Sequence, residues 1–297
     1  MRFVMRHKIL SIVLILVSIY IYLNYTMIIS GNPKIDRTSK FYTNDIYMSD
    51  ARIYKKLSKQ EKQAYDEIMD MVKKRERKRV IDLSKYGNIS ASDGGPIFLT
   101  AAEAILLDHP ELLQYATAGY SYRSDNNELK VNVEYAINNP IMEEVNTLKI
   151  QRIINKIKLE TSNMSDLEKI KYVYEWVGDN SKYDTLFTYA SKNQSIYNVF
   201  IKKNAVCAGF AKTSQVIFQN IGIESIPIVG ETTGPHMWNI IKYNGKYYYY
   251  DSTYAASIRD KKNPNYYDGL KQEELNDHRK YHTDWYPKIE TTSGIYK

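Results

Sequence analysis

Residues 205–253 decide the fold and read AVCAGFAKTSQVIFQNIGIESIPIVGETTGPHMWNIIKYNGKYYYYDST. This stretch contains the only cysteine of the chain, Cys207, followed by His236 and Asp251. Cys207 begins an apolar run that ends before Gly222, which predicts a helix starting at the cysteine. The unpaired N–H groups and the positive dipole end of a helix N-terminus favour a thiolate, the nucleophilic form of cysteine.

Three runs after this helix are rich in β-branched or aromatic residues and predict strands. They are residues 223–229, 237–243 and 246–251. Pro227 places the first strand at an edge or a bulge, because proline cannot donate a ladder hydrogen bond. Asn244-Gly245 separates the other two strands and predicts a hairpin with a two-residue type I′ turn.

The turn also sets the register of this hairpin. Tyr243 pairs with Lys246, so His236 and Asp251 become diagonal neighbours on one face, about 7–8 Å apart at the backbone. The carboxylate can then fix the tautomer of the imidazole while the other ring nitrogen faces a thiol. A three-residue loop with a bulge would break this parity. Asn239 faces the other way, and we expect it to hydrogen-bond nearby backbone.

The motif VCAGFAK…GI…IPIVG…HMWNII…NGKYYYYDSTY resembles the core of the bacterial transglutaminase-like superfamily, a papain-like cysteine fold. The resemblance covers roughly residues 165–255 and implies an α+β fold, in which a helix bearing the cysteine packs on an antiparallel sheet bearing histidine and aspartate. It assigns Cys207 as the nucleophile, His236 as the base and Asp251 as the orienting acid. It implies no cofactor. His-Met-Trp-Asn departs from the commoner His-Ala-Trp-Asn at one position.

Three aromatic residues are further candidates for contacts with an oxyanion or a substrate. Tyr183 and Tyr197 precede the cysteine at positions where members of the superfamily often carry tyrosine, and an oxyanion hole needs a donor beside the backbone N–H of Cys207. Packing is the alternative role for both in a chain with 28 tyrosines. Trp238 shares the face of His236, where it can shield an ion pair or fill the core.

The composition excludes several classes of protein. The chain has 297 residues, of which 43% are hydrophobic and 25% charged, as in globular proteins. Its net charge of +7 is not organised into a nucleic-acid-binding motif, so an anionic cell surface or plain solubility explains it, and no nucleic acid partner is expected. One cysteine cannot form an intramolecular disulfide or a zinc ribbon. His278 and His282 have metal-ligand spacing without a supporting motif, so no metal is expected.

Residues 9–29 carry no charge and are long enough to cross about 30 Å of hydrocarbon as a helix. They predict an uncleaved membrane anchor. A cleavable signal peptide is the alternative, but the apolar core is long and the A-x-A match is poor. Arg2, Arg6 and Lys8 keep the N-terminus in the cytoplasm. We therefore expect a single-pass protein of the cell membrane whose catalytic domain is extracytoplasmic and meets a protein or peptide substrate at the cell surface.

Four parts follow along the chain. They are the basic end and transmembrane anchor (1–30), a stalk (31–50), an α+β extension (51–140) and the transglutaminase-like catalytic domain (141–297). Capping boxes that begin at Ser58, Thr100 and Ser165 predict helix starts. The basic run from Lys73 to Arg79 is interpreted as a solvated helix end.

Patterning predicts further elements in the extension and at the start of the catalytic domain. Residues 115–123 and 129–136 alternate around a polar turn and predict a hairpin. Residues 143–159 carry an apolar stripe at helical spacing.

The residues support three functions. The leading one is a cysteine enzyme that attacks peptide or glutamine-type amide bonds through a thioester, as a peptidase or amidase with water, or as a crosslinking acyltransferase with a lysine amine. The second is a non-catalytic cell-surface binding or assembly module with the same fold. The third is an adaptor whose basic surface holds anionic polymers and whose cysteine is merely buried.

Overall fold

The computed structural model describes ten segments of the chain. They are residues 50–87, 89–113, 115–122, 127–186, 193–232, 234–258, 260–263, 265–270, 279–289 and 294–295. All belong to one compact unit, Asn44–Lys297. The predicted anchor at 9–29 and almost all of the predicted stalk lie outside the described residues. Within the described segments, no helix is long and apolar enough to cross a bilayer.

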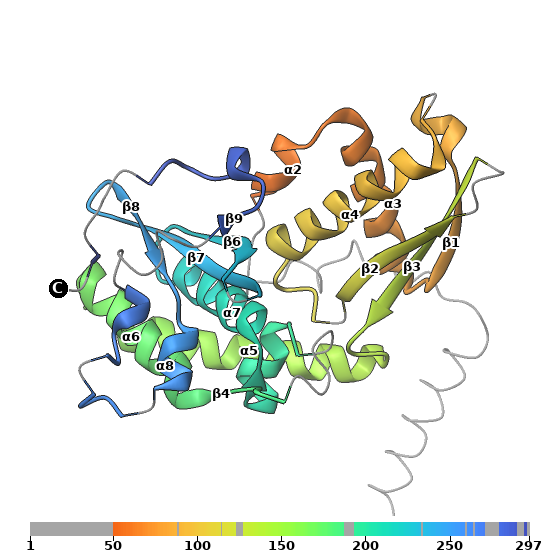
Figure 1. Ribbon diagram of the computed structural model, residues 1–297. Coiled ribbons are helices and arrows are strands. Elements are labelled where there is room, and N and C mark those ends of the chain that lie inside the picture. The colour runs from red at the N-terminus through yellow and green to blue at the C-terminus, as the bar shows by residue number, and fades with distance from the viewer. Residues whose placement is uncertain are drawn as a thin grey trace, which may run out of the picture. The chain divides into compact units, whose positions relative to one another are not determined.

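The extension consists of helices on one face of a three-stranded antiparallel sheet (Figure 1). The helices are α2 (Arg52–Lys56), α3 (Lys59–Lys74) and α4 (Ala91–Asp108). The strands are β1 (Lys78–Asp82), β2 (Tyr115–Tyr122) and β3 (Glu128–Tyr135), in the order β1-β3-β2. The predicted hairpin is therefore present. Leu129, Val131, Val133 and Tyr135 alternate along β3 and are buried in one core with side chains of α3 and α4.

Two predicted capping boxes are confirmed. The hydroxyls of Ser58 and Ser165 accept hydrogen bonds from the backbone N–H groups of Glu61 and Glu168, and both glutamate side chains reach back to the capping residue. Each box pairs two N–H groups that a helix start would otherwise leave unpaired.

The helix start predicted at Thr100 is wrong. Helix α4 begins at Ala91, with Ser90 as its N-cap, so Thr100 lies inside the helix. Tertiary packing outweighs the poor helix propensity of the Gly-Gly-Pro sequence in its first turns. A Cβ added to Gly95 would come within 2.2 Å of the ring of Tyr120, so the glycine allows α4 to lie close to β2.

The basic run from Lys73 to Arg79 is a solvated helix end in most of its length: Lys73, Lys74, Arg77 and Lys78 are exposed, as predicted, whereas Arg75 and Arg79 are partly buried. Two of its arginines are held in ion pairs: Arg79 with Glu67 at 2.9 Å, and Arg75 with Glu143, beyond the predicted boundary at residue 140. Both guanidinium groups are less than one-fifth exposed. The partner of Arg75 is distant in sequence, so the run gives no sign of it, whereas Arg79 also pairs with Glu76 inside the run.

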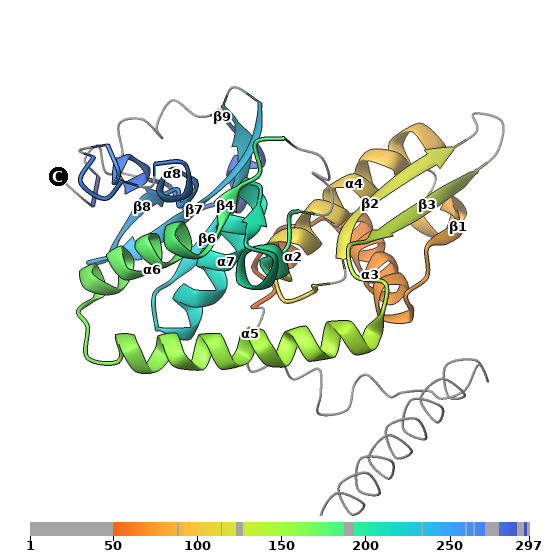
Figure 2. The ribbon, with the colours of Figure 1, turned by 90° about the horizontal axis from the view of Figure 1, so that it is seen from below.

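The second part of the unit combines three long helices with a four-stranded antiparallel sheet (Figures 1 and 2). The helices are α5 (Pro140–Thr161), α6 (Asp166–Asn180) and α7 (Cys207–Asn220). The strands are β6 (Ser225–Glu231), β7 (Pro235–Tyr243), β8 (Lys246–Tyr250) and β9 (Arg279–Lys280), in the order β8-β7-β6-β9. Helix α5 is longer than predicted because Asn139 caps it and Pro140 occupies its first turn.

Short elements complete this part of the chain. A two-stranded parallel ladder joins β4 (Lys182–Tyr183) to β5 (Asn204–Ala205). The remaining elements are η1 (Leu83–Tyr86), η2 (Asn198–Lys202), α8 (Thr253–Ser257), η3 (Asp268–Leu270) and η4 (Thr283–Trp285). At Pro227, β7 is the one described strand that pairs with β6, because β9 joins β6 only at Gly230 and Glu231. Pro227 therefore lies on an edge of the described sheet, as predicted.

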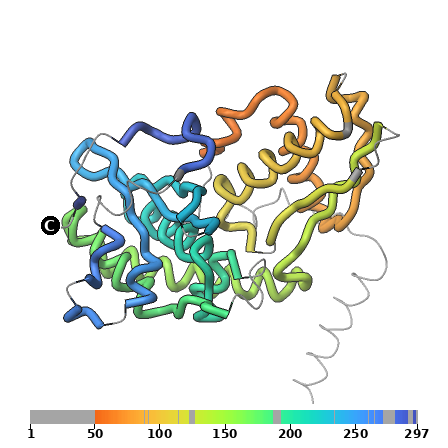
Figure 3. The backbone as a smooth tube through the Cα atoms, viewed as in Figure 1, coloured from red at the N-terminus to blue at the C-terminus, as the bar shows by residue number. Residues whose placement is uncertain are grey.

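Helix α7 packs against both parts of the described chain. Ala208 and Ala211 share a core with Ile53 and the helices of the extension, and the side-chain amide of Gln215 donates to the carbonyl of Leu107 at 3.1 Å. The C-terminal segment, residues 279–289, also contacts the extension, because Trp285 lies in the same core as Ile53. Figure 3 shows this segment beside the start of the described chain. The extension thus supports the helix that carries the cysteine. The predicted domain boundary at residue 140 stays a prediction.

Candidate active site

Cys207 is the first residue of α7, as predicted. The helix has no side-chain cap at Val206, and the N–H of Gly209 donates to the carbonyl of Val206 at 2.9 Å instead. Strand β5 ends two residues earlier and pairs with β4, which places Tyr183 opposite Ala205. This ladder brings a residue from far earlier in the chain beside the cysteine.

His236 and Asp251 come from neighbouring strands of the hairpin. Tyr243 pairs with Lys246 across a turn in which both central residues have positive φ, so the predicted register and type I′ turn are confirmed. The same register continues to the ends of the strands, and His236 Nε2 lies 2.7 Å from Asp251 Oδ2. His236 also hydrogen-bonds the side chain of Cys207. Because Nε2 is bonded to Asp251, this second bond uses Nδ1.

The carboxylate of Asp251 is buried, with an exposed fraction of 1%. Its second oxygen accepts hydrogen bonds from the backbone N–H and the hydroxyl of Thr253, at 2.9 and 2.6 Å. Burial alone would raise the pKa of Asp251, but the charge of His236 and these donors lower it below its usual value. Asp251 is therefore an anion that holds the imidazole in place.

The electrostatics of His236 follow from the same contacts. Burial lowers the pKa of the imidazole, but the charge and hydrogen bonds of Asp251 and Cys207 outweigh it and raise that pKa to about 10. The imidazolium form is thus favoured at neutral pH. A cation between a carboxylate and a thiol stabilises the thiolate.

The structure separates the three aromatic candidates. The pKa of Tyr183 is raised to about 12, mainly by burial, and its hydroxyl hydrogen-bonds both the side chain and the backbone of Cys207. Trp238 is fully buried and stacks on His236, with ring centroids 5.7 Å apart and planes at 19°. Tyr197 packs against a different core and under Lys202, and the described contacts do not join it to Cys207.

Asn239 is confirmed as a residue that bonds backbone. Its side-chain amide donates to the carbonyl of Ala211 on α7 at 3.0 Å. The contact ties the strand that bears His236 to the helix that bears Cys207, so it fixes the distance between the two elements.

Sequence reasoning missed three groups that position Asp251: Gly269, the Ser214–Ser252 pair and Thr253. The backbone N–H of Asp251 donates to the carbonyl of Gly269 at 2.8 Å, and the hydroxyls of Ser214 and Ser252 lie 3.0 Å apart in the core, so α7 is joined to the chain just after the aspartate. Thr253, two residues after an aspartate, carried a readable signal as a local turn donor. Gly269 carried none.

Gly269→Ala tests this support. A Cβ on Gly269 would lie 2.0 Å from the carbonyl oxygen of Asp251, which is backbone and cannot rotate away. We expect a loss of about 1–3 kcal/mol in the free energy of unfolding, measured by urea denaturation, together with displacement of Asp251. Gly119→Ala, where an added Cβ meets nothing within 4 Å, is the control and should stay near wild type. A stability of Gly269→Ala equal to that of the control would contradict the close contact.

The described residues contain no group of three or more His, Cys, Asp or Glu side chains able to hold a metal ion. His282 lies 3.6 Å from Glu103 and stacks on Trp285, and His278 lies outside the described segments.

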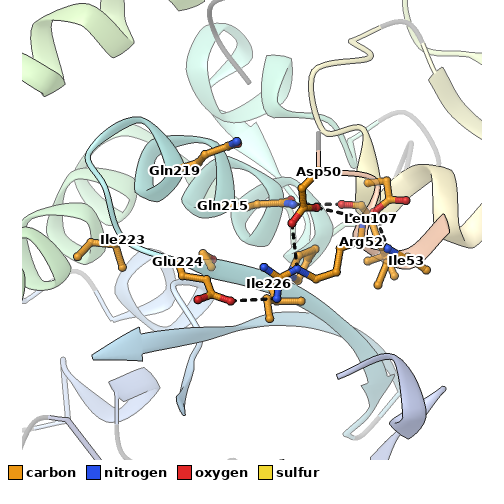
Figure 4. Close-up of a pocket in the computed structure, with 12 residues that line it drawn as sticks. Asp50, Arg52, Ile53, Leu107, Gln215, Gln219, Ile223, Glu224 and Ile226 are labelled. Carbon is orange, nitrogen blue, oxygen red and sulfur yellow. Dashed lines mark hydrogen bonds and ion pairs between the residues drawn. The ribbon is translucent and has the colours of Figure 1, made fainter. Parts of the chain in front are cut away.

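A cavity of about 110 Å³ lies at the other end of α7, between α2 and β6 (Figure 4). Arg52 crosses it in ion pairs with Asp50 and Glu224, at 3.2 and 2.9 Å. Its lining includes Gln215 and Gln219 but none of the triad. The cavity is thus separate from the thiol.

Comparison with known proteins identifies the class of domain that holds this site. Residues 152–252, which include Cys207, His236 and Asp251, match the sequence model of the Transglutaminase-like superfamily. This part of the chain is therefore similar to transglutaminase-like domains, within a fold of mixed helices and sheets. No curated protein sequence matches the chain.

Two solved structures show partial similarity. One is described as a TGase, with 17% identity, a TM-score of 0.31, and coverage of 46% of this chain and 43% of that one. The other is described as a "putative cysteine protease" from Cytophaga hutchinsonii, with 13% identity, a TM-score of 0.33, and coverage of 55% and 64%. The chain thus spans less than two-thirds of the length of either protein.

Proposed function

We propose that this protein is a membrane-anchored, extracytoplasmic cysteine enzyme that cleaves or transfers peptide or glutamine-type acyl groups through a thioester on Cys207. The observation that carries the proposal is the continuous hydrogen-bonded series from Cys207 through His236 to the buried Asp251. A thiol that only fills the core does not require an imidazolium held by a carboxylate beside it, whereas a catalytic nucleophile does. Residues 9–29 support the anchor.

The chemistry follows from the geometry. The thiolate of Cys207 attacks the carbonyl carbon of the amide and forms a tetrahedral oxyanion. The C–N bond then breaks as the imidazolium of His236 gives its proton to the leaving amine, which leaves a thioester. Water or a lysine amine next attacks the thioester while His236 takes its proton, and the C–S bond breaks to release the thiolate, which restores the thiolate–imidazolium pair. Asp251 holds the imidazole orientation throughout.

The oxyanion has two donors in this proposal. The backbone N–H of Cys207 stands at the start of α7, and the hydroxyl of Tyr183 bonds that same backbone and the thiol in the free enzyme. A substrate oxygen that enters there can replace these contacts with hydrogen bonds from both donors. Trp238 covers one face of His236 and keeps water from the ion pair.

Tyr183→Phe tests the oxyanion role. Removal of the hydroxyl should lower kcat by about 10²–10³-fold, because the donor acts mainly in the transition state. Tyr197→Phe is the matched control and should turn over like wild type. The kcat and KM of both variants would be measured on the same peptide. An unchanged kcat in Tyr183→Phe would assign Tyr183 to packing.

Mass spectrometry tests the proposed function itself. The full chain would be incubated with a library of glutamine-containing and cell-surface peptides and an isotope-labelled primary amine, alongside Cys207→Ala. Free acid or cleaved peptide indicates hydrolysis, and labelled adducts indicate transfer. Hydrolysis is the expected main product, because any open site admits water whereas transfer needs an amine site. Products that persist unchanged in Cys207→Ala, or no product with any peptide, would contradict the proposal.

A further inference from the structure

Helix α5 exposes apolar side chains on the face opposite its core contacts. Ile150, Ile154 and Ile157 are fully buried and pack in the main core of the transglutaminase-like domain. The outer side instead carries large apolar residues that are 41–77% exposed: Ile141, Met142, Val145, Leu148 and Leu159. An ordinary surface helix carries polar residues there, so this outer face is unusual.

The exposed residues form a stripe rather than a scatter. At 100° per residue, Val145, Leu148 and Leu159 all lie within about 40° of Ile141 around the helix axis. We call these four residues the α5 stripe. Figure 2 shows α5 along the margin of the folded unit, with α6 and α7 to one side of it. The stripe therefore faces away from the described core.

Basic side chains lie beside the α5 stripe, and one of them, Arg152, lies within it between Leu148 and Leu159. The exposed cations of this helix are Lys149, Arg152, Lys156 and Lys158, and its exposed acids are Glu144 and Glu160. Apolar residues on one line with Lys and Arg beside them are typical of helices that lie in the interface of an anionic bilayer. A second copy of the chain would bring the same cations face to face, so charge disfavours a symmetric dimer through this surface.

We propose that the α5 stripe rests on the surface of an anionic lipid bilayer, in the plane of the membrane. This inference rests on the proposed anchor at residues 9–29. Residues 31–49 connect that segment to the described unit, and a chain of this length reaches at most about 65 Å when fully extended. The tether therefore keeps the unit within contact distance of the lipid. The bound helix would hold the active site in one orientation relative to the membrane.

Site-specific labelling of the full chain tests the contact. Cys207→Ser removes the only cysteine, and Leu148→Cys or Leu99→Cys then accepts a single environment-sensitive fluorophore. The two leucines are matched, at 50% and 46% exposed, and Leu99 lies on α4, away from α5 in Figure 2. Each labelled chain would be reconstituted in phosphatidylglycerol vesicles that contain lipid brominated in its acyl chains, which quenches fluorescence on contact.

The inference predicts quenching at position 148, none at position 99, and weaker quenching at 148 in vesicles of uncharged phosphatidylcholine. Co-flotation with vesicles but no quenching at 148 would overturn the inference and leave the anchor standing. A blue-shifted but unquenched probe at 148 would show that protein covers the stripe, and equal quenching at both positions would show unspecific contact; both overturn it. Failure of the chain to float with vesicles would instead overturn the anchor.

Discussion

Cys207→Ala is expected to lower turnover of an accepted peptide by at least about 10⁴-fold. In the proposed mechanism every product passes through a thioester on this sulfur, and the chain has no second cysteine to replace it. The imidazole and carboxylate remain, but without a nucleophile they contribute little, because the members of a triad act as a unit. Mass spectrometry of single-turnover reactions measures the loss.

A second variant of the same helix, assayed in the same reaction, is the control for Cys207→Ala. Gln219→Ala alters the same helix at an exposed position near its other end, without touching the thiol, and it should retain turnover. Circular dichroism and urea denaturation establish that Cys207→Ala is folded. Turnover of Cys207→Ala within tenfold of wild type would contradict the thioester mechanism and favour a binding module.

Asp251→Asn is expected to reduce kcat by about 10⁴-fold while the protein stays folded. The asparagine can still accept the bonds from Thr253 with its oxygen, but its amide nitrogen then faces His236 Nε2 as a donor. The imidazole must then adopt the tautomer in which Nε2 accepts from that amide. The proton therefore sits on Nδ1, the nitrogen that faces Cys207. The ring can no longer take the thiol proton.

Asp108→Asn is the matched control for this variant. Asp108 is also buried, with an exposed fraction of 3%, and accepts backbone bonds from Ile53 and Tyr54 in the extension. It should lose stability without loss of kcat in the folded protein. Equal kcat in Asp251→Asn and Asp108→Asn would remove the orienting role of Asp251.

Local signals predicted the hairpin of the site correctly. Asn244-Gly245 requires a turn with positive φ at both residues, and one turn type fixes which residues of the two strands lie opposite. The relation between His236 and Asp251 follows from that count. The start of α7 at Cys207 was equally readable from the periodicity that follows it.

The parts that the sequence did not predict depend on contacts between distant residues. The ladder that brings Tyr183 to Cys207 is two residues long on each side, too short for a strand pattern. Gly269 shows its role only through its distance to Asp251. The start of α4 was misplaced because tertiary packing outweighed local propensity. The ion pair of Arg75 was missed because its partner, Glu143, is far away in the sequence.

The most direct test of the account is the rate of iodoacetamide alkylation of the full chain against pH, with and without His236→Ala. The single cysteine makes the signal unambiguous. Burial lowers the pKa of His236, but Asp251 and Cys207 raise it to about 10, so an imidazolium lies beside the thiol throughout the neutral range. The account predicts that the wild-type rate at pH 6.5 stays near its maximum, whereas the variant, like a free thiol of pKa about 8.5, slows by about 100-fold. The same pH profile in both proteins, or no alkylation in either, would contradict an activated Cys207.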